Sequence, residues 1–219
     1  MPKRTDIKKV LIIGGGATVI GQGAECDAQS LEAARTLSEM DYEIIYVDSN
    51  PFSITADSKY VKSSYIEPLT VDMVHRIIDT EHPDAVFAAC SGQSAMNLGL
   101  QLQEMGVLGG AVLLGTNSDN IRLCEEYRVA SKDYELKSGI VDSVETGIGL
   151  INTIGLPAFI RPVSTAGGGG SSVAYNTEEY VRALNIAIDH SNVSKVVIRE
   201  AVVGWKEIHT VVARDSYNN

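Results

Sequence analysis

Apolar segments and segments with helical spacing alternate along the first 120 residues of the chain. The apolar segments are short and continuous, which is typical of strands buried on both faces of a parallel sheet. They cover residues 9–13, 43–47, 85–89 and 111–114. The segments with helical spacing lie between them, at residues 24–40, 71–80 and 95–104. This alternation predicts an α/β domain with a doubly wound parallel sheet over residues 1–120.

The pattern changes after residue 120. A charged segment with helical character follows, and we predict a linker helix over residues 121–140. Shorter elements then follow in mixed order, with helices at residues 144–154 and 177–190 and strands at 158–161, 173–176, 196–200 and 207–213. The sequence therefore predicts a second unit, of the α+β class, over residues 141–219.

A glycine-rich segment in the second unit has the composition of a phosphate-binding loop. Residues 160–172 read Ile-Arg-Pro-Val-Ser-Thr-Ala-Gly-Gly-Gly-Gly-Ser-Ser. Consecutive glycines leave backbone N–H groups accessible to a ligand, and the hydroxyl side chains add further donors. Arg161 offers a planar fork of donors that matches phosphate oxygens. The segment predicts a loop that closes over a nucleoside triphosphate, with a ligand-free hairpin tip as the alternative.

A second glycine cluster, Gly14-Gly15-Gly16, follows the first predicted strand. A dinucleotide-binding fingerprint would place its third glycine at position 19, which is Val19. Asp48 ends the second strand, about ten residues beyond the spacing of roughly 20 that is usual for a ribose-binding acid. We therefore interpret these glycines as tight turns that let a helix pack against the sheet.

Other polar groups allow two interpretations each. Ser91-Gly92-Gln93-Ser94 follows the third strand at the carboxyl edge of the predicted sheet, where ligands of such folds bind. A polar cap between strand and helix explains the same residues. Glu200 and Glu207 flank Gly204-Trp205-Lys206, and either acid could accept a hydrogen bond from a ribose hydroxyl or an adenine amino group. Exposed charge at a sheet edge is the alternative for both.

Composition limits the cellular compartment and the classes of binding partner that we expect. The formal net charge is −10, which argues against a nucleic-acid or acidic-membrane partner. The cysteines, Cys26, Cys90 and Cys124, are odd in number and far apart, as expected of reduced thiols in the cytoplasm. The four histidines do not cluster at metal-ligand spacing, and we assign no metal ligand. The apolar run near the N-terminus breaks at Gly14, too early for a signal peptide or a membrane span.

A series of short motifs in a fixed order extends over both predicted units. They are MPKRTDI at 1–7, VIGQ at 19–22, NP at 50–51, YIEP at 65–68, RII at 76–78, PDAV at 83–86, GQ at 92–93, IRP at 160–162, AYN at 174–176 and GWKE at 204–207. On these motifs the chain resembles the N-terminal part of the large subunit of carbamoyl-phosphate synthetase. The resemblance implies a Rossmann-like pre-ATP-grasp domain at 1–120, a linker helix at 121–140 and the N-terminal portion of an incomplete ATP-grasp domain at 141–219.

The resemblance also implies a reaction and its participants. In this family the corresponding half of the subunit phosphorylates bicarbonate with ATP to give carboxyphosphate. Ammonia from a glutaminase small subunit converts it to carbamate, and a second half phosphorylates the carbamate to carbamoyl phosphate. The product serves arginine or pyrimidine biosynthesis. The implied cofactors are ATP and, for the complete enzyme only, magnesium or manganese.

Carried over position by position, the resemblance implies an ATP site in the second unit. Arg161 would bind phosphate, and Gly167 and Gly168 would belong to the loop that closes over the phosphates. Glu200, the backbone of Val202, and Glu207 would hold the adenine and the ribose; these positions complete the implied set. The resemblance implies no catalytic side chain within this chain.

The chain departs from the family pattern at several positions. Tyr127 stands where the family has a second ATP-binding arginine, with Arg128 beside it, and Ser164 and Ala166 replace an aromatic residue and a methionine of the loop. The family's metal-binding residues lie beyond the aligned part, so we expect a truncated ligase that is inactive alone. The alternatives are a non-catalytic nucleotide-binding or interaction module, and assembly through an unfinished sheet edge.

Overall fold

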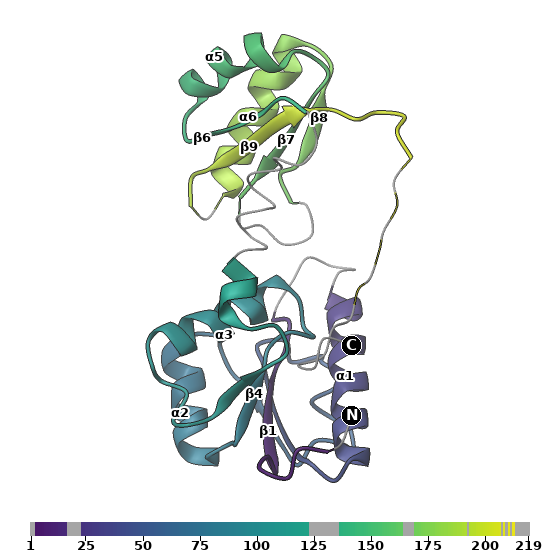
Figure 1. Cartoon of the computed structure of the whole chain (residues 1–219), viewed down its shortest axis with the longest axis vertical. Helices are drawn as coiled ribbons and strands as arrows, with labels where there is room; N and C mark the ends of the chain where they lie inside the picture. Colours follow the sequence, from purple (N-terminus) through teal and green to yellow (C-terminus); the bar gives the residue numbers. More distant parts are fainter. Residues whose placement is uncertain are drawn as a thin grey trace. The chain divides into compact units, whose positions relative to one another are not determined.

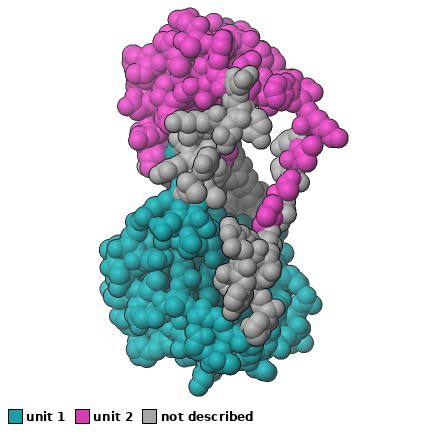
Figure 2. Space-filling view, in the orientation of Figure 1, with its two compact units in different colours: residues 1–132, 163–169 teal, residues 133–162, 170–219 magenta. Residues whose placement is uncertain are grey.

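The structure of the protein is a computed structural model that describes residues 3–16, 23–122, 136–163, 169–191, 193–206, 208, 210 and 212. The chain divides into two compact units, which Figure 2 colours separately. Unit 1 consists mainly of Met1–Lys132, and unit 2 consists of Asp133–Pro162 and Gly170–Asn219. Within the described part of the chain, no helix combines the length and the apolar character needed to cross a membrane.

Unit 1 is built on a five-stranded parallel sheet (Figure 1). Its strands are β1 (Lys9–Ile13), β2 (Glu43–Asp48), β3 (Ser63–Ile66), β4 (Ala85–Phe87) and β5 (Val112–Leu114). They lie in the order β3-β2-β1-β4-β5, and every neighbouring pair is parallel. The helices α1 (Gly23–Glu39), α2 (Val71–Glu81) and α3 (Gln93–Glu104) follow β1, β3 and β4.

Helices cover both faces of this sheet. Leu11 and Ile13 of β1 pack with side chains of α2 and α3, whereas Val10 and Ile12 pack with Ala34 of α1. All four β1 side chains are fully buried. Burial on both sides explains why the strand is a continuous apolar run, because neither face can carry polar side chains without loss of stability. The predicted doubly wound parallel sheet is confirmed.

Unit 2 contains a four-stranded antiparallel sheet in the order β6-β9-β7-β8. The strands are β6 (Ser138–Val141), β7 (Ala158–Pro162), β8 (Ser172–Ala174) and β9 (Val196–Glu200). Two helices, α5 (Val144–Ile154) and α6 (Thr177–His190), pack on one face of this sheet (Figure 1). The apolar core between the sheet and these helices includes Ile160, Leu184 and Ile198. This unit is of the predicted α+β class, so the fold-class prediction is confirmed for both parts.

Two elements differ from the sequence-based expectation. The strand β3 was not predicted, and neither was β6, whose residues Ser138–Val141 overlap the end of the linker helix expected at 121–140. Residues 118–122 are helical, with the Asn117 side chain accepting the Asn120 N–H at 2.8 Å, but residues 123–135 lie outside the described part. The strand predicted at 207–213 also falls largely outside it.

Candidate nucleotide-binding site

Arg161 lies on the face of the unit 2 sheet that is opposite to α5 and α6. Along β7, Ala158, Ile160 and Pro162 are buried, and Phe159 and Arg161 between them are half-buried. Because successive side chains of a strand point to opposite faces, this alternation separates the two sets. Ala158 and Ile160 belong to the core under the helices. Arg161 therefore projects from the other face, at the start of the glycine-rich segment 160–172.

Cross-strand register extends this face to β9. Phe159 pairs with Arg199, and Arg161 pairs with Val197. Residues directly opposite each other in an antiparallel pair share a face of the sheet. We call the surface formed by Phe159, Arg161, Val197 and Arg199 the arginine face. The guanidinium carbon of Arg199 lies 4.8 Å from the centre of the Phe159 ring, which is a cation–π contact.

Glu200 ends β9 at the far end of the same strand pair, and Val202 follows shortly after it. Glu200 pairs with Ala158, which places Arg161 three positions further along the ladder. The pleat puts the Glu200 side chain, which is exposed, on the alternate side from Arg161 and Arg199. Its backbone therefore offers the more direct route to a ligand on the arginine face.

The chain turns back directly after Glu200. The Ala201 N–H donates to the Pro157 carbonyl at 3.0 Å, and the Trp205 N–H donates to the Val202 carbonyl at 3.1 Å. Gly204 adopts a φ of +84°, as the third residue of a type II turn requires. No described residue accepts a hydrogen bond from the Val202 N–H. That N–H is a donor at the end of the strand, available to the edge of a flat heterocycle.

Three predicted site residues, Gly167, Gly168 and Glu207, lie outside the described residues. The same holds for Tyr127, Arg128, Ser164 and Ala166, at which the chain departs from the family pattern. Arg161 and Glu200 thus lie on one pair of strands, three positions apart in register and with side chains on alternate faces, and Val202 follows the end of β9. Arg199 and Phe159 join them and were not identified from the sequence, because only the cross-strand register reveals that they share a face with Arg161.

The glycine cluster of unit 1 serves packing. A Cβ at Gly14 would overlap the Asp48 carboxylate, and a Cβ at Gly15 would lie 2.8 Å from the Cβ of Cys26 in α1. These glycines allow the strand end, Asp48 and the first turn of α1 to approach closely, which agrees with the predicted helix-packing turns.

The carboxylate of Asp48, the residue considered as a ribose-binding acid, accepts hydrogen bonds from groups of the same chain. Its Oδ1 accepts the N–H groups of Gly16 at 3.1 Å and Asn50 at 2.9 Å, and its Oδ2 accepts the Tyr46 hydroxyl at 2.7 Å. Burial raises the pKa of Tyr46, so the phenol stays protonated and keeps donating. These contacts leave the carboxylate buried and argue against a dinucleotide site.

The polar residues after β4 are used in a similar way. The buried Ser91 hydroxyl lies 2.7 Å from the Ser30 hydroxyl of α1. Gln93 Nε2 donates to Asn97 Oδ1 at 2.9 Å within α3. Cys26 and Cys90 are free, and burial is the main cause that raises the pKa of each thiol. These contacts favour the packing interpretation over a ligand site.

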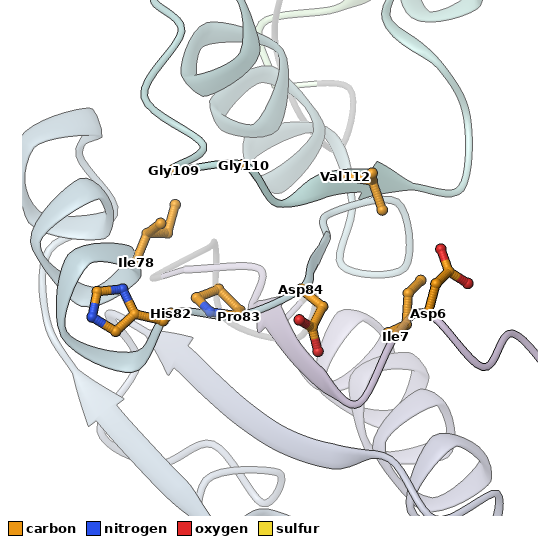
Figure 3. Close-up of a pocket in the computed structure, with 9 residues that line it drawn as sticks. All are labelled: Asp6, Ile7, Ile78, His82, Pro83, Asp84, Gly109, Gly110 and Val112. Atoms are coloured by element: carbon orange, nitrogen blue, oxygen red, sulfur yellow. The ribbon is translucent and has the colours of Figure 1, made fainter.

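A pocket of about 340 Å³ lies at the amino edge of the unit 1 sheet (Figure 3). Asp6, His82 and Asp84 are its ionisable lining residues. Asp84 Oδ2 already accepts the N–H groups of Lys8 at 2.8 Å and Lys9 at 2.9 Å. Ligands of doubly wound sheets bind at the carboxyl edge, and two carboxylates disfavour an anion. The pocket is therefore a poor nucleotide site.

Comparison with known proteins places both units in one family. Residues 6–123 match the family model "Carbamoyl phosphate synthase preATP-grasp domain", and residues 127–219 match "Carbamoyl-phosphate synthase L chain, ATP binding domain". The chain is 43% identical, over its whole length, to the N-terminal section of the carbamoyl phosphate synthase large chain of Aquifex aeolicus, and covers 41% of that relative. It is 40% identical to the large chain of Pseudomonas aeruginosa and covers 21% of it.

Solved structures share the fold at low sequence identity. The biotin carboxylase domain of Hydrogenobacter thermophilus 2-oxoglutarate carboxylase, solved with MgADP, ADP and bicarbonate, matches with a TM-score of 0.62 at 17% identity. The match covers 90% of this chain and 45% of that one. An N5-carboxyaminoimidazole ribonucleotide synthetase in complex with ADP matches with a TM-score of 0.59 at 18% identity, over 91% of this chain and 49% of that one. The sequence matches show that this chain belongs to the carbamoyl phosphate synthase large-chain family.

Proposed function

We propose that the chain binds ATP on the arginine face of unit 2 and takes part in an ATP-dependent ligase reaction of the carbamoyl phosphate synthase type. The observation that carries this proposal is the position of Arg161. It projects from the sheet face opposite the helices, near the end of the strand that precedes the four glycines at 167–170. Family membership supports the same conclusion.

Each proposed site residue has a distinct role. The Arg161 guanidinium donates in a bidentate manner to phosphate oxygens, and the backbone N–H groups of Gly167 and Gly168 surround the terminal phosphates. The Val202 N–H and the backbone of Glu200 bind the edge of the adenine, and the Glu207 carboxylate accepts the ribose hydroxyls. With a net charge of −10, the protein must hold an anion by local donors of this kind.

In the proposed reaction, an oxygen of bicarbonate attacks the terminal phosphorus of ATP, and the bond to ADP breaks. The resulting carboxyphosphate reacts with ammonia to form carbamate with loss of phosphate, and a second phosphorylation gives carbamoyl phosphate. A glutaminase small subunit supplies the ammonia in this scheme. We place the protein in the cytoplasm and in arginine or pyrimidine biosynthesis.

Phosphoryl transfer requires divalent cations that neutralise charge on the phosphates. Among the described residues, no group of three His, Cys, Asp or Glu side chains could hold a metal ion. We therefore assign no metal-dependent step to the described residues. Magnesium or manganese belongs, in this proposal, to the complete enzyme.

The proposed domains follow one another along the sequence. Residues 1–120 form the pre-ATP-grasp domain, and a linker begins at residue 121. The N-terminal portion of the ATP-grasp domain extends to residue 219 and includes β6 (Ser138–Val141), which overlaps the range first expected for the linker. The ranges of the two family matches, 6–123 and 127–219, support this division. The chain spans less than half the length of the relatives it matches, so the complete synthesis is proposed for a protein of their full length.

Calorimetric titration of the purified protein tests the nucleotide proposal. We expect binding of ATP and no binding of NAD, and we expect Arg161→Ala to weaken ATP binding at least about tenfold, the loss of roughly one charge-assisted hydrogen bond. Arg182→Ala is a matched control, because it removes an exposed arginine of α6 on the opposite face. Equal ATP affinity of the wild type and Arg161→Ala would contradict the proposal.

A bicarbonate-dependent ATPase assay separates the ligase from the alternative when it is run on a protein of the relatives' full length, because this chain is expected to be inactive alone. Turnover of the full-length protein that Arg161→Ala abolishes supports the ligase reaction. ATP binding without turnover in the full-length protein supports a non-catalytic nucleotide-binding module.

A further inference from the structure

The arginine face carries a second cation, Arg199, at a defined position. Cross-strand pairing puts Arg199 opposite Phe159, and Phe159 lies two residues before Arg161 on the same strand. Residues two apart on a strand are separated by about 6.6–6.8 Å, so the two arginines emerge from neighbouring rows of one face. Phe159 belongs to the same face and is a neighbour of both, opposite Arg199 and two residues before Arg161.

The Phe159 ring fixes the guanidinium of Arg199. The 4.8 Å separation is within the range of a favourable cation–π contact. A guanidinium that stacks on a ring keeps its N–H donors in its own plane, directed away from the ring. Among the described residues, no carboxylate oxygen lies within 4.0 Å of an Arg199 nitrogen. Its donors are therefore oriented, and no carboxylate of the described part of the chain pairs with them.

The order of residues along the strands gives the position of that anion. Glu200 and Val202, at one end, belong to the proposed nucleoside subsite, and Arg161, towards the other end, belongs to the proposed phosphate subsite. Arg199 lies between these ends, one position from Glu200. A nucleotide that extends from the nucleoside end to Arg161 carries its α-phosphate over this part of the face.

We propose that Arg199 binds the α-phosphate of the nucleotide and that Phe159 is the residue that positions its guanidinium. The inference rests on the proposed ATP site and adds a binding residue to it. It assigns the two arginines to different phosphates. Arg199 recognises the phosphate shared by ATP, ADP and AMP, and Arg161 recognises the phosphates that AMP lacks.

A nucleotide series distinguishes these assignments. Wild type, Arg199→Ala and Arg161→Ala are titrated with ATP, ADP, AMP and adenosine by calorimetry. We expect Arg199→Ala to weaken ATP, ADP and AMP by a similar factor of about ten, which corresponds to about 1.4 kcal/mol, and to leave adenosine unchanged. Arg161→Ala should weaken ATP and ADP and leave AMP unchanged. Arg182→Ala, on α6, should change none of them.

The role of Phe159 is tested in the same series. Phe159→Leu keeps an apolar side chain and removes the ring, so it should weaken the same three nucleotides by a smaller factor. In the double variant with Arg199→Ala it should add no further loss, because the ring then has no guanidinium to position. Arg199→Lys keeps the charge without the planar fork and should lie between wild type and Arg199→Ala. Thermal unfolding followed by circular dichroism verifies that each variant is folded.

The possible failures are distinct. If wild type binds no ATP, both the ATP site and this inference are overturned. A second outcome is that ATP binding by wild type depends on Arg161, but wild type and Arg199→Ala bind ATP, ADP and AMP with equal affinity. In that case the ATP site stands and this inference is overturned. If Arg199→Ala weakens adenosine as strongly as AMP, Arg199 contacts the nucleoside, and the assignment to the α-phosphate is wrong.

Discussion

Tyr180 of α6 connects the two helices of unit 2 through one buried hydrogen bond. Its hydroxyl donates to the Gly147 carbonyl of α5 at 2.7 Å, and its side chain is fully buried. Burial raises the pKa of Tyr180 to about 12, so the phenol is a protonated donor across the physiological range. This hydrogen bond therefore adds a polar contact to the apolar packing of α5 against α6.

Removing that oxygen should destabilise unit 2. We expect Tyr180→Phe to lower the free energy of unfolding by about 1–2 kcal/mol, because a buried hydrogen bond is lost while the ring remains. Tyr175→Phe is the control, since Tyr175 is 61% exposed, and it should change stability by less than about 0.5 kcal/mol. Urea unfolding followed by circular dichroism measures both. Equal effects of the two substitutions would contradict the role of the buried hydroxyl.

At the same scale, residue type and spacing indicated part of the proposed site. Arg161 was identified because an arginine between an apolar run and four glycines has few structural explanations. Arg199 was not identified, because its alignment with Phe159 depends on pairing between strands that lie far apart in sequence. The role of Asp48 depends likewise on Gly16, Asn50 and Tyr46, which approach it only in the fold.

At the scale of elements, α5 contains two glycines in different surroundings, the buried Gly147 and the exposed Gly149. A Cβ at Gly147 would overlap the Leu184 side chain of α6, which is fully buried, whereas a Cβ at Gly149 would meet no atom within 4 Å. Gly147→Ala should therefore destabilise by about 1–3 kcal/mol through overpacking, despite the higher helix propensity of alanine.

Gly149→Ala is the matched comparison in the same helix. It should stabilise by about 0.5–1 kcal/mol, because alanine favours the helix and nothing obstructs its methyl group. Differential scanning calorimetry of the two variants should show melting temperatures that move in opposite directions. A decrease in both would mean that α5 tolerates no added Cβ, and a rise in both would mean that Leu184 moves aside freely.

The elements that sequence patterning missed are edge strands. β3 reads Ser-Ser-Tyr-Ile with alternating half-buried and exposed residues, and β6 contains Gly139. Neither contains the apolar run on which the other strands were identified, because an edge strand has a neighbour on only one side and needs less apolar surface. Their strand character comes from backbone pairing with β2 and β9, which composition does not reveal.

At the scale of the whole molecule, acidic side chains outnumber basic ones. Several ionised carboxylates stabilise the fold of unit 1. Backbone N–H groups of Lys9 and Lys8 hold the pKa of Asp84 below its ordinary value. The Tyr65 hydroxyl is the main cause that lowers the pKa of Glu81, and Lys62 is the main cause for Glu43. These partners favour the ionised carboxylates and thereby link folding to pH.

The sign of this linkage predicts loss of stability in acid. A carboxylate whose folded pKa is lowered contributes stability above its unfolded pKa of about 4, and that contribution disappears as the pH falls through the folded value. We expect the urea midpoint to be constant between about pH 7 and 6 and to fall between about pH 5 and 3. Glu81→Gln should have a lower midpoint at neutral pH and a shallower fall, so that the two curves converge in acid. Asp57→Asn removes an exposed carboxylate, so its urea midpoint should fall with pH as that of wild type does. If the midpoint of Glu81→Gln falls as steeply as that of wild type, the hydrogen bond from Tyr65 to Glu81 does not couple folding to pH.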